Sequence, residues 1–246
     1  MRHITVEHHA NGVSLFTINR PEKRNAICSQ TAIELQNAFA DFDDSAQRVA
    51  VITGSGDQAF TAGADVNDVP ELWRCIPTAG IHTEKPVIGA VGGWCVGGGV
   101  VLAAMCDLLV VADNAKFSYP EAKLGLTHGM IATLAGRLPH KVAMEIILLG
   151  TTLDAKRAYD VGFVNRVVPT DQQVQTALEM GAELAVMAPL VLKTLKRFVV
   201  DSVLPISPSE QFARAKHELE VVAQSDDFQE GLAAFQQKRA PVFQGK

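Results

Sequence analysis

The apolar stretch 87–104 places the tightest limit on how this chain of 246 residues can fold. A membrane-spanning helix needs about 20 apolar residues in a row. The stretch is shorter than that and glycines interrupt it repeatedly, which disfavours any long helix. It is typical of a buried strand over 87–91, a glycine-rich turn, and a helix that begins at the Gly97–Gly98–Gly99 cluster.

The rest of the chain alternates strand-like and helical runs, which predicts an α/β fold with a mostly parallel sheet. Runs rich in β-branched residues predict strands over 4–7, 13–18, 49–53 and 108–112. Apolar residues at helical spacing, at Leu35, Ala38, Phe39 and Phe42, predict a helix that Ser29 caps. After Pro139 the periodicity is almost continuously helical.

Composition and charge exclude several classes of protein. Apolar residues make up 48% of the chain, which argues against a disordered polymer. The formal net charge is −5, so no overall basic surface attracts nucleic acid or an anionic membrane. The densest group of cations is interpreted as a solvated helix face: Lys193, Lys196 and Arg197.

The four cysteines show neither a Cys-x-x-Cys pair nor a spacing typical of metal ligands. The first residues also lack the apolar core of a secretory signal. We therefore expect a cytoplasmic protein with no metal site.

The Gly97–Gly98–Gly99 cluster is the first candidate for chemistry. A helix that begins at glycines presents unpaired N–H groups, which can bind an anion or a developing oxyanion. Close packing of backbone under a tight turn explains the same glycines equally well. Neither of the common nucleotide-binding glycine patterns is present here.

Two further segments have the composition of a site. The segment 60–66 places small residues after a strand, where a backbone N–H can approach a ligand closely. The segment 117–126 places Glu121 after Pro120 among apolar residues, where burial would raise the pKa of a carboxyl group and make it a general base. Capping or ion pairing at a helix start is the alternative role for Glu121.

Together these segments resemble the enoyl-CoA hydratase/isomerase family, the crotonases. The likeness rests on the order and spacing of four motifs and extends over almost the whole chain: 19–26 (NRPEKRNA), 62–65 (AGAD), 97–99 (GGG) and 120–121 (PE), with further similarity at 143–145 and 230–239. It implies a spiral of β-β-α units over 1–190 that carries the CoA and acyl site. A helical region over 191–246 is then expected to assemble the chain into trimers or hexamers.

The resemblance also implies roles for individual residues. The amides of Ala64 and Gly98 match the pair that holds the thioester carbonyl oxygen, and Glu121 matches a catalytic glutamate. The residues that match CoA contacts are Arg24, Ala26, Ala62, Phe235 and Lys238, the last two reaching the site of a neighbouring subunit. Without the family, Phe235 would be assigned to a core stripe and Lys238 to the solvated surface.

One departure from the family decides the expected reaction. Hydratases of the family carry a first glutamate twenty residues before the second, and here that position is Val101. A single Glu121 suffices to move a proton along a dienolate, so an enoyl-CoA isomerase is the leading prediction. The alternatives are an enoyl-CoA hydratase or lyase and a CoA-binding homologue that has lost catalysis. No cofactor beyond the CoA moiety of the substrate is expected.

A second departure concerns the acyl pocket, where the segment 65–85 is shorter than in hydratases of the family. Trp94 is predicted to fill part of the gap, beside Val101 and Gly129. His128 stands near the expected place of Glu121, either as an auxiliary acid–base group or as a helix cap.

Overall fold

The computed structural model describes residues 2–125, 127 and 133–246 and has two sheets that the chain visits in turn. The six-stranded sheet has the order β1 (Ile4–His8), β2 (Val13–Ile18), β3 (Val49–Gly54), β5 (Val87–Val91), β7 (Leu108–Ala112) and β10 (Arg166–Val168). The four-stranded sheet has the order β4 (Ala59–Thr61), β6 (Trp94–Val96), β8 (Lys116–Ser118) and β9 (Leu153–Asp154). From β3 onward the strand pairs β3–β4, β5–β6 and β7–β8 each contribute one strand to each sheet, which confirms the spiral of repeated units.

Parallel pairing runs through the large sheet from β2 to β10, and only β1 is antiparallel. In the small sheet β4, β6 and β8 are parallel and β9 is antiparallel. Parallel strands end at the same edge of a sheet. The turns that follow β4, β6 and β8 therefore lie side by side.

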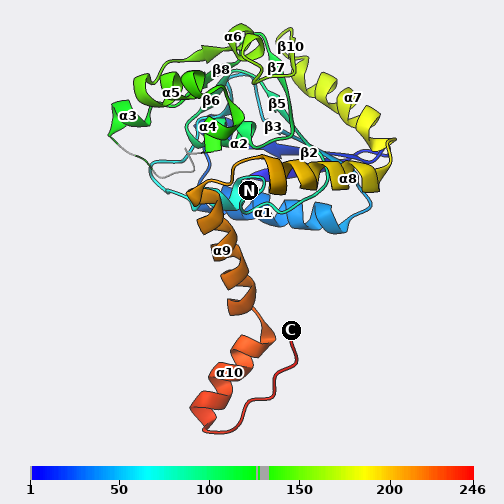
Figure 1. The fold of residues 1–246 in the computed structure, drawn as a ribbon, viewed down its shortest axis with the longest axis vertical. Helices are drawn as coiled ribbons and strands as arrows, with labels where there is room; N and C mark the ends of the chain where they lie inside the picture. Colours follow the sequence, from blue (N-terminus) through cyan, green and yellow to red (C-terminus); the bar gives the residue numbers. More distant parts are fainter. Residues whose placement is uncertain (1, 126, 128–132) are drawn as a thin grey trace.

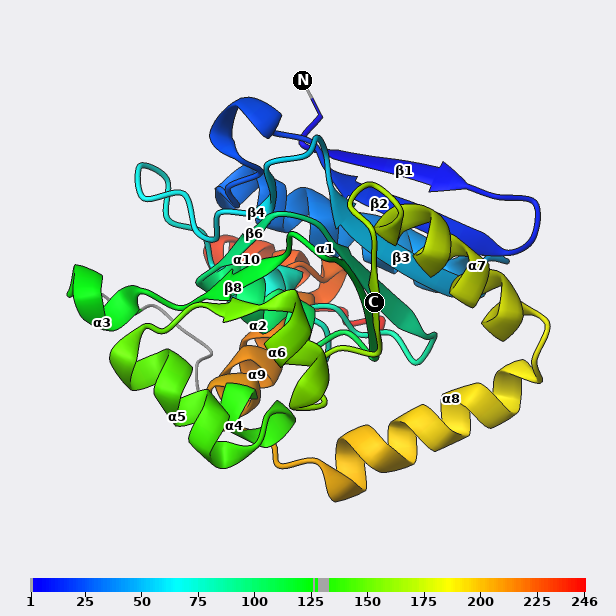
Figure 2. The same cartoon turned by 90° about the horizontal axis from the view of Figure 1, so that it is seen from above.

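The central strands β3, β5 and β7 of the large sheet are buried on both faces, which explains their unbroken apolar runs. In β3, Val49 and Val51 pack with α7 (Gln173–Ala185), while Ala50 and Ile52 belong to the main core. The main core includes α1 (Ser29–Asp44), whose Phe39 stacks on Phe16 of β2 at 4.3 Å between ring centroids. Figure 2 shows α7 and α1 on opposite sides of this sheet.

The remaining helices lie between residues 98 and 237. They are α2 (Gly98–Ala104), α3 (Glu121–Leu124), α4 (Leu134–Arg137), α5 (His140–Leu149), α6 (Ala155–Asp160), α8 (Pro189–Phe198), α9 (Pro208–Ala223) and α10 (Asp226–Gln237). Short 3-10 turns cover Pro21–Lys23 and Leu72–Cys75, and a π turn covers Val199–Val203. No helix in the described ranges is long and apolar enough to span a membrane.

The helices α9 and α10 extend away from the two sheets, at one end of the long axis of the molecule (Figure 1). Arg74 binds Glu220 of α9, and Glu71 binds Lys216 at 2.7 Å, so α9 is tied to the body at its middle and near its end. Large apolar side chains on the extension are exposed: Phe212, Leu219, Val221, Val222, Phe228, Leu232 and Phe235. The helical character predicted for 191–246 is confirmed.

Two local predictions are wrong. The N-cap of α1 is Cys28, and Ser29 instead donates its hydroxyl to Asp68 Oδ1 at 2.6 Å. The prediction of a solvated cation face on α8 fails for Lys196, which is largely buried and pairs with Asp107 at 2.7 Å, whereas Lys193 and Arg197 are exposed and pair with Glu84. Acidic partners distant in sequence therefore neutralise this group and hold α8 on the body.

Candidate active site

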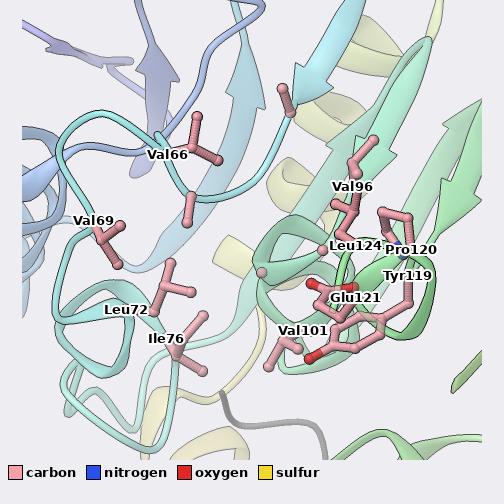
Figure 3. A pocket seen from close by; sticks show the side chains of 14 residues that line it. Val66, Val69, Leu72, Ile76, Val96, Val101, Tyr119, Pro120, Glu121 and Leu124 are labelled. Carbon is pink, nitrogen blue, oxygen red and sulfur yellow. The ribbon is translucent and has the colours of Figure 1, made fainter. Parts of the chain in front are cut away.

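A cavity of about 230 Å³ lies between the loop after β4 and the starts of α2 and α3. Figure 3 shows Val66, Val69, Leu72 and Ile76 on one wall, with Glu121, Tyr119 and Val101 on the other. The full lining is Ala62, Ala64, Val66, Val69, Leu72, Ile76, Val96, Gly97, Gly98, Val101, Tyr119, Pro120, Glu121 and Leu124. Despite its shortness, the segment 65–85 therefore forms one wall of the pocket.

Each glycine of the 97–99 cluster lies against a different neighbour. A Cβ on Gly97 would lie 2.7 Å from Glu121 Oε1, and one on Gly99 would lie 2.4 Å from Thr61 Cγ2. A Cβ on Gly98 would lie 2.8 Å from Leu72 Cδ1. The cluster thus serves close packing, and it also begins α2, so the two explanations offered by the sequence hold together.

The loop after β4 is held against the start of α2. Gly63 has φ +85°, and a Cβ there would lie 2.6 Å from the carbonyl oxygen of Val96 and 3.4 Å from the amide nitrogen of Gly98. The amide of Asp65 donates to Ile27 O at 2.8 Å, and its carboxylate accepts from Arg20 at 3.1 Å. Only glycine permits this approach of two backbones.

This packing leaves two backbone N–H groups unused at the pocket. Among the described residues, neither the amide of Ala64 nor that of Gly98 has a hydrogen-bond acceptor, although their neighbours Ile27, Asp65 and Gly97 all donate to carbonyls. Ala64 and Gly98 both line the cavity. The pair has the composition of an oxyanion hole, in which preorganised donors stabilise developing negative charge.

Glu121 is the acid of the site. It begins α3, makes no capping bond, and takes part in no ion pair within the described ranges. Its Oε2 atom is buried without a hydrogen-bond partner there. Burial among apolar side chains raises the pKa of Glu121 to about 7. No ion pair of Glu121 is seen among the described residues, and its carboxyl group is suited to exchange protons near neutral pH.

The polar residue that the sequence analysis missed is Tyr119. It lies at the end of the chain leading from β8 into α3, it is 4% exposed, and it lines the cavity together with Val101. Burial raises the pKa of its phenol, so the group is a neutral donor at physiological pH. Its position directly before Pro120 and Glu121 was the available signal.

The residues predicted to hold CoA fall into two groups. Ala62 lines the pocket and its amide donates to Arg24 O at 2.9 Å, and Ala26 is buried two residues after Arg24. Arg24 is exposed in a left-handed backbone conformation with φ 49°. Phe235 and Lys238 lie on the distant α10 extension, and Phe235 is 85% exposed, so it belongs to no core stripe of its own chain.

The prediction that Trp94 fills the acyl pocket is wrong. Its ring is 41% exposed and lies beneath the ammonium of Lys116 at 5.2 Å. The residues lining the cavity include Val96 but not Trp94, which lies on the same face of β6 two residues before Val96 and so beyond the reach of the pocket. His128 and Gly129 lie outside the described residues.

This chain belongs to the enoyl-CoA hydratase/isomerase family, whose characteristic sequence pattern matches residues 8–246. It is 36% identical to the carnitinyl-CoA dehydratase of Salmonella typhi and 37% identical to that of Escherichia coli O157:H7, with 94% of each chain covered. A probable enoyl-CoA hydratase/isomerase from Mycobacterium abscessus superposes with a TM-score of 0.76 at 38% identity, covering all of both chains. A carnitinyl-CoA hydratase from Mycobacterium avium superposes with a TM-score of 0.77 at 30% identity, again over all of both chains. The protein is therefore an acyl-CoA enzyme with the crotonase fold.

Replacing Gly98 by proline tests the oxyanion hole directly. Proline is compatible with the first position of a helix but has no N–H. We expect Gly98→Pro to lower kcat by roughly 100- to 1,000-fold, the usual loss for one such donor. Gly98→Ala is the matched control, because it keeps the N–H and its Cβ meets only the flexible end of Leu72. Equal losses in both variants, measured by steady-state kinetics, would contradict the assignment.

Glu121→Gln should stabilise the protein at alkaline pH. The unfolded carboxyl ionises near pH 4.5 and the folded one near 7, so the native state loses stability as the pH rises between these values. Glutamine removes this penalty, which we place at about 1–2 kcal/mol because the residue is only partly buried. Thermal unfolding should show a higher Tm for the variant at pH 8 and no difference near pH 4. A difference in Tm between variant and parent that does not change with pH would refute the raised pKa of Glu121.

Proposed function

We propose that Glu121 removes a proton from the acyl chain of a CoA thioester while the Ala64 and Gly98 amides hold the thioester oxygen. One observation supports this proposal: an unpaired carboxyl group with a pKa of about 7 lies in the same apolar cavity as two unused backbone donors. Electron density released by the proton moves to the thioester oxygen, where the two N–H groups stabilise the enolate. The chemistry needs no cofactor beyond the CoA of the substrate.

The reaction that Glu121 can perform alone is the shift of a double bond. The carboxylate takes a proton from C2 of a 3-enoyl-CoA, the electron pair passes into a dienolate, and the carboxylic acid returns the proton to C4. The side chain of Val101, which is 2% exposed, presents no second acid–base group to the cavity. This single-carboxylate geometry supports an enoyl-CoA isomerase.

Hydration and dehydration form a second candidate function, favoured by the relatives. Two of the similar proteins are named carnitinyl-CoA dehydratases, and a similar solved structure is named a carnitinyl-CoA hydratase. Such a reaction forms or breaks a carbon–oxygen bond at C3 of the acyl chain. It requires a polar group that orients the oxygen atom, in addition to the base at C2.

We further propose that the CoA site is completed by a second copy of the chain within a trimer or hexamer. Phe235 and Lys238 lie on the α10 extension, at the end of the molecule away from the two sheets (Figure 1). The extension exposes a row of large apolar side chains, which an oligomer would bury. The aromatic ring suits the adenine of CoA and the ammonium suits its phosphates.

The proposed base is tested with a 3-enoyl-CoA and a 2-enoyl-CoA offered separately. We expect the parent enzyme to move the double bond without changing the product mass, with kcat/KM rising with pH to half its plateau near pH 7, where Glu121 ionises. Glu121→Gln should lose at least about 100-fold in that rate, the typical contribution of a general base. Brisk hydration of the 2-enoyl-CoA by the parent, with no isomerisation of the 3-enoyl-CoA, would instead select the second candidate.

Removing Lys238 tests the shared CoA site. Loss of a charge-assisted bond to phosphate should weaken CoA binding by about 10-fold or more without dissociating the oligomer. Calorimetric titration measures the affinity and light scattering measures the mass. Lys156→Ala is the control, because Lys156 is equally charged and 85% exposed on α6. Unchanged affinity in Lys238→Ala would exclude this residue from the site.

A further inference from the structure

The side chain of Tyr119 lies at the place where the site lacks a second acid. Tyr119, Val101 and Glu121 line the same cavity, and Figure 3 shows the phenol pointing toward Val101 beside the Glu121 carboxyl group. Val101 presents only methyl groups. Apart from Glu121, the described lining residues include no other ionisable or hydroxyl side chain than Tyr119.

The hydroxyl of Tyr119 can donate a hydrogen bond to a ligand in the cavity. The side chain is 4% exposed, so bulk water does not solvate it freely. Thr127 is its hydrogen-bonding neighbour and lowers the pKa of the phenol, as a group that donates to the phenol oxygen does. A hydroxyl oxygen that accepts a bond from Thr127 still has its own hydrogen to donate.

We propose that the Tyr119 hydroxyl holds the oxygen atom at C3 of the acyl chain, in the role that a carboxylate at position 101 would otherwise have. The inference rests on the proposed function of Glu121 as the base at C2. It deepens that function by naming the substrate class: thioesters that carry a hydroxyl group at C3, or 2-enoyl thioesters to which water adds. Tyr119 is then a specificity-determining and positioning residue, because an acyl chain without oxygen at C3 makes no use of it.

The elimination balances with a single base. Glu121 takes the proton from C2, and the electron pair forms the enolate held by Ala64 and Gly98. The enolate then re-forms the thioester carbonyl and the C2–C3 double bond, and the C3–O bond breaks with its electrons on oxygen. Glu121 returns the proton to that oxygen, and water leaves. Tyr119 donates a hydrogen bond to the oxygen throughout and ends with its own proton.

Tyr119→Phe tests the proposal, because it removes the hydroxyl and keeps the ring that packs in the wall. Two rates are measured on each variant: loss of water from 3-hydroxybutyryl-CoA, and deuterium exchange at C2 of butyryl-CoA in heavy water. We expect the first rate to fall about 10- to 100-fold, as for one lost hydrogen bond in a transition state. The second should stay within about threefold of the parent, since butyryl-CoA has no oxygen at C3.

Two further variants sharpen the result. Tyr159→Phe is the matched control, because the only other tyrosine of the chain lies 54% exposed on α6 and should change neither rate. Val101→Glu added to Tyr119→Phe should restore water elimination by returning a polar group to that wall. Equal losses in both rates, no loss in either, or a parent enzyme that eliminates no water would overturn the role of Tyr119. A parent enzyme without exchange at C2 would instead contradict Glu121 as the base.

Discussion

The close approach of two backbone turns is the constraint on which the site depends. The turn after β4 and the turn after β6 come together at Gly63, where a side chain would collide with Val96 O. Parallel pairing of β4 with β6 brings the turns to the same edge of the small sheet, and glycine allows them to touch. Because each turn is held by its own hydrogen bonds, the amides of Ala64 and Gly98 are left facing the cavity.

The second constraint is electrostatic, and it opposes stability. Glu121 lies in an apolar cavity without a compensating cation, so its ionised form is destabilised and its pKa rises. A residue chosen for stability alone would be paired or solvated. Two apolar clusters and the Phe16–Phe39 stack stabilise the fold, which offsets the loss of stability caused by the ionised Glu121. The arrangement fits a general tendency of active sites to sacrifice local stability for reactivity.

Much of the local structure was predictable from the sequence because local rules decide it. Strands β2, β3, β5 and β7 coincide with runs of β-branched residues, and the Gly97–Gly99 cluster begins a helix as predicted. The errors concern side chains with partners far along the chain. Ser29 binds Asp68 instead of capping α1, and Lys196 binds Asp107 instead of facing solvent. Strand parity places Trp94 on the same face as the lining residue Val96, and the sequence did not show how far along β6 the pocket extends.

By itself the sequence determined the family, the α/β class, the two backbone donors and the presence of Glu121 with valine at position 101. These features are motifs of contiguous residues, so their meaning does not depend on contacts across the fold. Only the tertiary structure decided that Glu121 is partly buried with one carboxyl oxygen unpartnered, that the 65–85 segment forms the opposite wall, and that Tyr119 shares the cavity with Val101. The physical reason is that burial, pKa and side-chain direction are set by residues from several elements, which meet only when the two sheets are assembled.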